Sequence, residues 1–188
     1  MFNISNYILL LFLLFQLSII PNCRKKTSLD SVNTLELTDH QGRLFKFKDM
    51  ESKNMILYFG FSNCPDKCPI ALSILSKVLI ELKEYNIYGI FISLDPIRDD
   101  PQKLRRFINS NPNLNLIALT GSGNNIQKIG EEFGITSIRK DYSQNSYFFD
   151  HTNQIIFVDK NFQILARFPG NISTKSLKEE AKRVYQLK

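Results

Sequence analysis

Two cysteines and one histidine are the side chains in this sequence best suited to chemistry. Cys64 and Cys68 are separated by three residues in the segment Gly60–Pro69, which reads GFSNCPDKCP, and His151 follows much later. Paired thiolates select soft ions such as Cu(I) or Zn(II). Redox dithiols normally have two intervening residues, and the wider spacing here suits a metal ion as well as a disulfide. The spacing therefore leaves three interpretations open: a metal site, a redox pair and a structural disulfide.

The cysteine pair lies where a predicted buried strand ends and a predicted helix begins. Met55–Phe61 reads MILYFGF, a continuous apolar run typical of a central strand. Apolar residues then recur at helical spacing between Ala71 and Leu82. The positive end of a helix dipole favours thiolates, and we expect this effect especially at Cys68. In parallel sheets the carboxyl ends of the strands open into the ligand crevice, so the pair is well placed for binding.

His151 precedes a second apolar run, Ile155–Val158, which is predicted to be a strand. If this strand runs antiparallel to Met55–Phe61, it begins at the edge where the parallel strands end, so His151 faces the cysteine loop. Two thiolates and one imidazole form a set that suits Cu(I) and also holds Cu(II). A structural zinc site usually has four protein ligands, and three are in view here. The other histidine, His40, lies in the turn Asp39–Gly42 and is expected to be a surface residue.

A second polar cluster follows the next predicted strand, at the sheet edge where the cysteines are expected. It contains Asp95 and Arg98. We expect a loop role for both, with Asp95 in a turn and Arg98 in an ion pair with Asp99 or Asp100. A direct metal role for Asp95 is the alternative interpretation.

The order of the predicted elements indicates an α/β domain with a largely parallel sheet covered on both faces. A β-hairpin comes first, then three strands alternating with three helices, then a second hairpin and a last helix. This order is typical of a thioredoxin-like mixed sheet with flanking helices and an added N-terminal β-hairpin. The predicted strands are Thr34–Thr38, Leu44–Lys48, Met55–Phe61, Tyr88–Leu94, Leu114–Leu119, Ile155–Val158 and Gln163–Phe168.

The N-terminus predicts export and attachment to a membrane. Residues 8–20 read ILLLFLLFQLSII, roughly 20 Å as a helix, which suits a signal peptide better than a span of the roughly 30 Å bilayer core. Cys23 follows in a segment that resembles a bacterial lipobox, so we expect lipidation of Cys23, with an uncleaved anchor as the alternative. The chain then divides into a leader (residues 1–23), a polar tether (residues 24–33) and one domain (residues 34–188).

The charge distribution argues against nucleic-acid binding. The net charge is +6 at pH 7, and Arg24, Lys25 and Lys26 supply half of it. The other basic residues are spread out and form no stripe interleaved with aromatic residues. Hydrophobic residues make up 43% of the chain, which is enough for one well-filled core and argues against disorder.

The motifs around the candidate residues resemble those of the Sco/SenC family. The family pattern Gly-Phe-Thr-x-Cys-Pro-Asp-x-Cys-Pro is matched by Gly60–Pro69. Three further motifs occur in the family order, at Leu37–Gly42, at Ser93–Pro101 (SLDPIRDDP) and at Asp150-His151-Thr152. The resemblance covers residues 34–187.

The resemblance implies a copper-binding protein rather than an enzyme, with Cys64, Cys68 and His151 as the ligands of Cu(I) or Cu(II). It implies delivery of copper to the binuclear copper centre of cytochrome c oxidase, or maintenance of the thiols of that centre. The implied partners are the copper-bearing oxidase subunit and other copper chaperones. Together with the leader, it implies a domain held on the periplasmic side of a bacterial cell envelope.

Two other functions stay open, and two departures from the family pattern bear on them. A thiol–disulfide oxidoreductase uses Cys64 and Cys68 without a metal and has no need of His151. A peroxidase-like enzyme needs one cysteine of low pKa, which the sequence does not single out. Ser62 replaces the family threonine and keeps its hydroxyl. Lys67 places a cation beside the pair, where it lowers thiolate pKa values, disfavours copper entry or is simply exposed.

Overall fold

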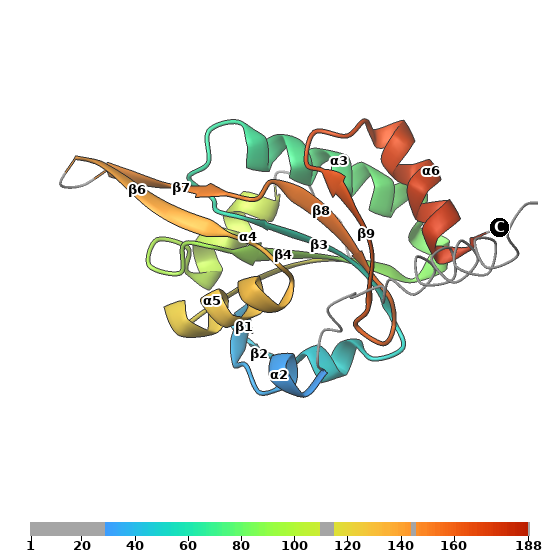
Figure 1. Cartoon of the computed structure of the whole chain (residues 1–188), viewed down its shortest axis with the longest axis horizontal. Helices are drawn as coiled ribbons and strands as arrows, with labels where there is room; N and C mark the ends of the chain where they lie inside the picture. The colour runs from blue at the N-terminus through green and yellow to red at the C-terminus, as the bar shows by residue number, and fades with distance from the viewer. Residues whose placement is uncertain (1–28, 110–114, 144–145, 188) are drawn as a thin grey trace, which may run out of the picture.

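A seven-stranded mixed sheet forms the centre of the domain (Figure 1). The computed structural model describes residues 29–109, 115–143 and 146–187. The strands lie in the order β2-β1-β5-β4-β3-β8-β9. Their bounds are β1 Leu37–Asp39, β2 Leu44–Phe45, β3 Asn54–Gly60, β4 Ile87–Ser93, β5 Leu116–Gly121, β8 Gln154–Val158 and β9 Ile164–Pro169.

The three central strands β3, β4 and β5 are parallel, and the strands on either side of them are antiparallel. Tyr58 of β3 lies opposite Phe91 of β4 and opposite Ile155 of β8. Because β8 runs antiparallel to β3, it begins at the edge where β3 ends. The predicted direction of the strand after His151 is therefore confirmed, and the cysteine loop and the histidine reach one edge of the sheet.

Helices cover both faces of the sheet. Three helices, α3, α4 and α6, pack on one face, where they contribute Leu75, Leu104 and Leu177, respectively, to the buried cluster that contains Tyr58. The short helix α2, the 3-10 helix η1 and α5 pack on the other. The helices are α2 Leu29–Asn33, η1 Phe47–Met50, α3 Lys67–Glu81, η2 Lys83–Tyr85, α4 Pro101–Asn109, α5 Gly123–Glu132 and α6 Thr174–Tyr185.

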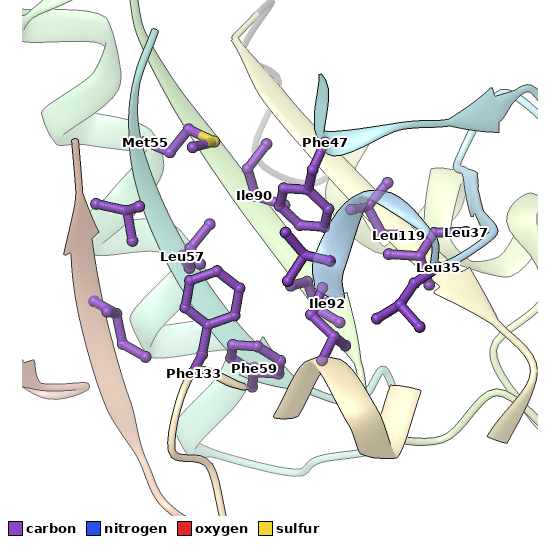
Figure 2. Packing of buried hydrophobic residues seen from close by; sticks show 14 of the residues in the cluster. Leu35, Leu37, Phe47, Met55, Leu57, Phe59, Ile90, Ile92, Leu119 and Phe133 are labelled. Atoms are coloured by element: carbon purple, nitrogen blue, oxygen red, sulfur yellow. The ribbon is translucent and has the colours of Figure 1, made fainter. Parts of the chain in front are cut away.

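The central strands are apolar throughout because both of their faces are buried. Leu57 and Phe59 of β3 point to the same face as Ile90 of β4 and pack near Phe133 (Figure 2). The residue between them, Tyr58, points to the opposite face, as the period of two along a strand requires. Each such aliphatic or aromatic side chain contributes about 1.5–3 kcal/mol when it is fully buried. This packing fixes the end of β3, and with it the start of the cysteine loop.

A second, two-stranded sheet was not predicted from the sequence. It is the hairpin of β6 (Ser137–Ser143) and β7 (Ser146–His151), which projects beyond the edge of the layers in Figure 1. Every side chain of β6 is exposed, so the segment lacks the alternation of apolar and polar residues that identifies a half-buried strand. His151, predicted only to precede the strand Ile155–Val158, is the last residue of β7.

The N-terminal part differs from the prediction in two places. The predicted strand Leu44–Lys48 is only two residues long (β2), and the chain then forms η1. Phe47 and Met50 are three residues apart, so one turn of 3-10 helix places both on the buried side. The last five residues of the expected tether, residues 24–33, form α2, and Val32 is fully buried in the core.

The predicted α/β class with a mixed sheet, flanking helices and an N-terminal hairpin is otherwise confirmed. Within residues 29–187, gaps aside, none of the helices has the length and apolar character needed to cross a bilayer. The predicted leader and its Cys23 lie outside the described residues.

Candidate metal centre

The cysteine loop joins the end of β3 to the start of α3. The N–H of Cys64 donates to the carbonyl of Phe61 (3.2 Å), which closes a turn directly after the strand. The N–H of Cys68 donates to the sulfur of Cys64 (3.4 Å), so this sulfur lies at the N-terminus of α3. Cys64 is half-buried, Cys68 is fully buried, and neither is in a disulfide. The loop therefore presents one sulfur to the surface and holds the second behind it.

The two sulfurs have opposite acid–base properties. A hydrogen bond from the Cys68 side chain, joined by the backbone N–H groups of Cys68, Asp66 and Lys67, lowers the pKa of Cys64 to about 5. The pKa of Cys68 is raised, because its thiol bonds to Cys64 and its sulfur is buried. The expectation that the helix start favours the thiolate especially at Cys68 is therefore wrong. Cys64 accepts the N–H groups, and one thiolate opposes the formation of a second beside it.

A buried carboxylate from another loop fixes the start of the cysteine loop. Asp99 is fully buried and accepts hydrogen bonds from the N–H of Ser62 (2.9 Å), the hydroxyl of Ser62 and the hydroxyl of Ser93 (2.7 Å). Lys103 lies 3.5 Å from Asp99 and also donates to the side-chain oxygen of Asn63 (2.6 Å). Serine in place of threonine at position 62 keeps the hydroxyl that Asp99 binds.

His151 is held with one ring nitrogen bonded and the other left as an acceptor. Nδ1 lies 3.1 Å from the carbonyl oxygen of Thr152. Because a carbonyl only accepts, Nδ1 carries the proton, and Nε2 is the nitrogen available to a metal. The ring packs edge-on against Phe61, with centroids 6.1 Å apart. Burial lowers the pKa of His151, which favours the neutral form that a ligand needs.

The cysteines and the histidine lie at the same edge of the sheet without forming a closed site. Phe61, three residues before Cys64, contacts the imidazole, and the charge of Cys64 acts on His151 by raising its pKa against the effect of burial. In the part of the chain that the structure describes, no three His, Cys, Asp or Glu side chains are grouped closely enough to hold a metal ion. The structure therefore brings the three predicted residues near one another but does not assemble them.

The second polar cluster ties the β6–β7 hairpin to the main sheet. Asp95 is fully buried, forms an ion pair with Arg98 and accepts a hydrogen bond from the Tyr147 hydroxyl (2.8 Å). Arg98 also donates to the carbonyl of Tyr147 (3.0 Å), and its guanidinium lies 3.6 Å from the centre of that ring. The expected ion pair of Arg98 with Asp99 or Asp100 is therefore wrong. Oδ1 of Asp95 binds the strand that ends in His151 directly, and Oδ2 binds Arg98, which also binds that strand.

The other polar residues singled out in the sequence have different contacts. His40 is half-buried, and its Nδ1 accepts the N–H of Ala118 (3.2 Å), which ties the first hairpin to β5. Asp150 is exposed and pairs with Lys140 across the hairpin (2.7 Å). Lys67 is exposed, and its charge acts on His151, whose pKa it lowers. The cation beside the pair thus acts on the imidazole.

Aromatic residues around the candidate site were missed by the sequence analysis. Phe149 packs against Phe61 and against Tyr147, in both cases with centroids 5.8 Å apart. Tyr147, Phe149 and His151 alternate along β7 and so share one face of the hairpin. That alternation was the available signal, but it is short, and the sequence analysis assigned no strand there.

The comparisons with known proteins agree with one another. A protein-family model described as SCO1/SenC matches residues 24–186 of the chain. The SCO2-like protein of Rickettsia typhi is 33% identical over 149 residues, which cover 77% of this chain and 72% of that protein.

Two solved structures with copper bound have the same fold. ScoI of Arabidopsis thaliana superposes with a TM-score of 0.75 at 25% identity, covering 82% of this chain and 97% of that one. ScoI of Bradyrhizobium japonicum superposes with a TM-score of 0.72 at 28% identity, covering 80% and 96%. The thioredoxin-like class predicted from the sequence is confirmed by these superpositions.

The first prediction concerns the different reactivity of the two thiols. Iodoacetamide should modify Cys64 before Cys68, because Cys64 is half-exposed with a pKa of about 5 and Cys68 is buried. The alkylation rate at Cys64 should change little between about pH 6.5 and 8.5. An ordinary thiol, with a pKa of about 8.5, would react roughly tenfold faster for each pH unit at the lower end of this range. Peptide mapping by mass spectrometry measures both rates. A rate at Cys64 that climbs steeply with pH contradicts the prediction.

The second prediction concerns Asp99. Asp99→Ala should lower the free energy of unfolding by about 2–3 kcal/mol, because it leaves the buried donors of Ser62 and Ser93 without their charged acceptor. Ser62→Ala, which keeps the backbone bond to Asp99, should cost about 1 kcal/mol. Urea unfolding of the two variants measures the difference, and equal losses rule out the proposed anchoring by the carboxylate.

Proposed function

The chain belongs to the SCO1/SenC family, and on that premise we propose that it binds one copper ion through Cys64, Cys68 and His151 and delivers it as a metallochaperone. Proteins of this family take part in copper handling and cytochrome c oxidase assembly. The recipient that we propose is the binuclear copper centre of cytochrome c oxidase. Copper is cargo in this scheme, and the protein is a carrier rather than an enzyme.

The observation that carries the proposal is the arrangement of the three donor atoms at one sheet edge. The Cys64 sulfur is accessible and its low pKa supplies a thiolate at neutral pH. The Cys68 thiol donates a hydrogen bond to it, and the imidazole of His151 carries its proton on Nδ1. Two soft sulfur donors and one neutral imidazole form a donor set that fits copper.

Binding requires a local closing movement, because the three side chains are near one another but not grouped for a metal ion. Cys64, which is half-exposed and supplies a thiolate, is the first donor to meet the ion. Cys68 then gives up its proton, and His151 approaches with Nε2, so that binding releases a proton. Delivery follows by ligand exchange in the opposite order, through the exposed side of the site.

A second function is favoured by the unequal pKa values of the two thiols. A thiol–disulfide oxidoreductase needs one exposed thiolate to attack and one buried thiol to resolve, as Cys64 and Cys68 provide. The Cys64 thiolate would attack a partner disulfide, the mixed disulfide would be resolved by Cys68, and the partner would leave as a dithiol. The resulting Cys64–Cys68 disulfide removes two copper ligands, so the two activities exclude each other at any moment.

We also propose that the domain is exported and held at the periplasmic face of a bacterial membrane. The apolar leader and Cys23 in its lipobox-like context support this. A lipid anchor would keep the carrier beside a membrane-bound oxidase and its copper-bearing subunit.

The third prediction is the copper titration. The reduced full-length chain in detergent should bind one Cu(I), measured by competition with bicinchoninate. Cys64→Ser and Cys68→Ser should abolish tight binding, because each removes one of two thiolates. His151→Ala should weaken binding by at least about tenfold, since loss of a ligand costs more than loss of a group that supports one.

Two matched controls keep this titration specific. His40→Ala removes the other histidine of the chain, and Cys23→Ser removes the third thiol, so both should bind Cu(I) as the unchanged protein does. If His151→Ala and His40→Ala bind equally well, the ligand assignment is wrong. If the unchanged protein takes up no copper but its pair exchanges with a disulfide substrate, the oxidoreductase is the function.

The fourth prediction concerns the anchor. In a bacterial host, mass spectrometry of the N-terminal peptide should show a diacylglyceryl group on Cys23, and Cys23→Ser should abolish it. Cys64→Ser, which leaves the leader unchanged, should retain the lipid. An unmodified Cys23 on an intact leader would instead indicate an uncleaved anchor.

A further inference from the structure

Tyr58 places a hydroxyl group in the apolar layer beneath the cysteine pair. It lies in β3, is fully buried, and faces the same side of the sheet as Cys68 and Phe91. Its ring packs at 6.3 Å from the ring of Phe91. A buried hydroxyl is costly without hydrogen-bond partners, so its partners indicate why the position carries tyrosine rather than phenylalanine.

The partners of this hydroxyl come from both halves of the candidate site. It donates its one proton to the side-chain oxygen of Asn153 (3.0 Å), and it lies beside the sulfur of Cys68, the other acceptor to which the same O–H can turn. Gly60 makes the second contact possible, since a Cβ at this position would lie 2.7 Å from the Cys68 sulfur and 3.2 Å from the Tyr58 ring. The ring and the sulfur therefore share the space that a side chain at position 60 would fill.

Asn153 belongs to the histidine side of the site. It lies two residues after His151, between the end of β7 and the start of β8. Its carbonyl accepts the N–H of Gly170 (3.1 Å), and a Cβ at Gly170 would lie 2.1 Å from its side-chain oxygen. The close approach of the Gly170 backbone thus holds the amide of Asn153 against the Tyr58 hydroxyl.

We propose that Tyr58 is a positioning residue of the copper site, whose hydroxyl links the sulfur of Cys68 to the chain segment that carries His151. The proposal rests on the copper-binding function proposed above. The hydroxyl sets the position of the inner sulfur relative to the β7–β8 junction, and its O–H can be donated to that sulfur when the sulfur is a ligand. Hydrogen bonds around a ligand sulfur tune the properties of a bound copper ion.

The test compares Tyr58→Phe with a control of the same chemistry. Tyr185→Phe also deletes a tyrosine hydroxyl, on a half-buried residue, and this hydroxyl donates to the carbonyl of Met55 (2.6 Å) at the other end of β3. Tyr58→Phe should weaken Cu(I) binding by ~10–100-fold, and should move the sulfur-to-copper charge-transfer band of the CuCl2-loaded protein to lower energy. Tyr185→Phe should leave both unchanged.

A measurement without copper tests the contact with Cys68 separately. In a glutathione redox buffer, Tyr58→Phe should shift the midpoint potential of the Cys64–Cys68 pair to a more negative value, because the reduced sulfur loses a neighbouring hydrogen-bond donor. Asn153→Ala keeps the hydroxyl beside Cys68 and releases the histidine segment. It should therefore weaken Cu(I) binding while leaving the midpoint near that of the unchanged protein.

These outcomes separate the two proposals. If the unchanged protein binds no copper, the copper-binding function fails, and the midpoint measurement still decides whether Tyr58 acts on Cys68. If Tyr58→Phe matches Tyr185→Phe in affinity, spectrum and midpoint, the positioning role is overturned. If Asn153→Ala binds Cu(I) as tightly as the unchanged protein, the link to the histidine segment is overturned.

Discussion

The contact between the Cys64 sulfur and the N-terminus of α3 is the interaction on which the site depends. The first turn of a helix has N–H groups without intrahelical acceptors. Here the N–H of Cys68 is directed at the Cys64 sulfur, so the loop satisfies a helix end and stabilises a thiolate with the same bond. The burial of β3 fixes where the loop begins, and α3 fixes where it ends, which leaves few positions for the two sulfurs.

The sheet topology supplies the other half of the arrangement. Parallel order in β3 and β4 places the cysteine loop and the loop with Asp95 and Asp99 at one edge, and antiparallel β8 brings the chain back to that edge. Each loop then holds another: Asp99 binds Ser62 of the cysteine loop, and Asp95 binds Tyr147 of the hairpin. The buried carboxylates that follow β4 therefore connect the loop that carries the cysteines to the hairpin that carries His151.

The sequence predicted the parts of this arrangement that depend on local pattern. Apolar runs identified β3, β4 and β8. The motifs identified Cys64, Cys68 and His151 as the candidate ligands. It did not predict the β6–β7 hairpin, because β6 is exposed on every residue and has no apolar face. It also assigned the thiolate to the wrong cysteine. The choice depends on which sulfur the N–H groups reach, and this is set by the loop conformation rather than by residue spacing.

A site whose donor groups lie near one another without being assembled is suited to reversible binding of an ion rather than to permanent binding. The Cys68 thiol donates a hydrogen bond to the Cys64 sulfur, and the imidazole is packed against Phe61, so each of these groups has a stable partner when no ion is present. In the proposed function, binding would exchange these contacts for metal bonds and release would restore them, so the net free energy of binding would be smaller than for a rigid, preformed cage. Rigidity is concentrated instead in the buried groups behind the site, Asp95, Asp99 and Tyr58, none of which is exposed. The proposed carrier thus combines rigid buried groups with donor side chains that can make a short movement to reach the ion.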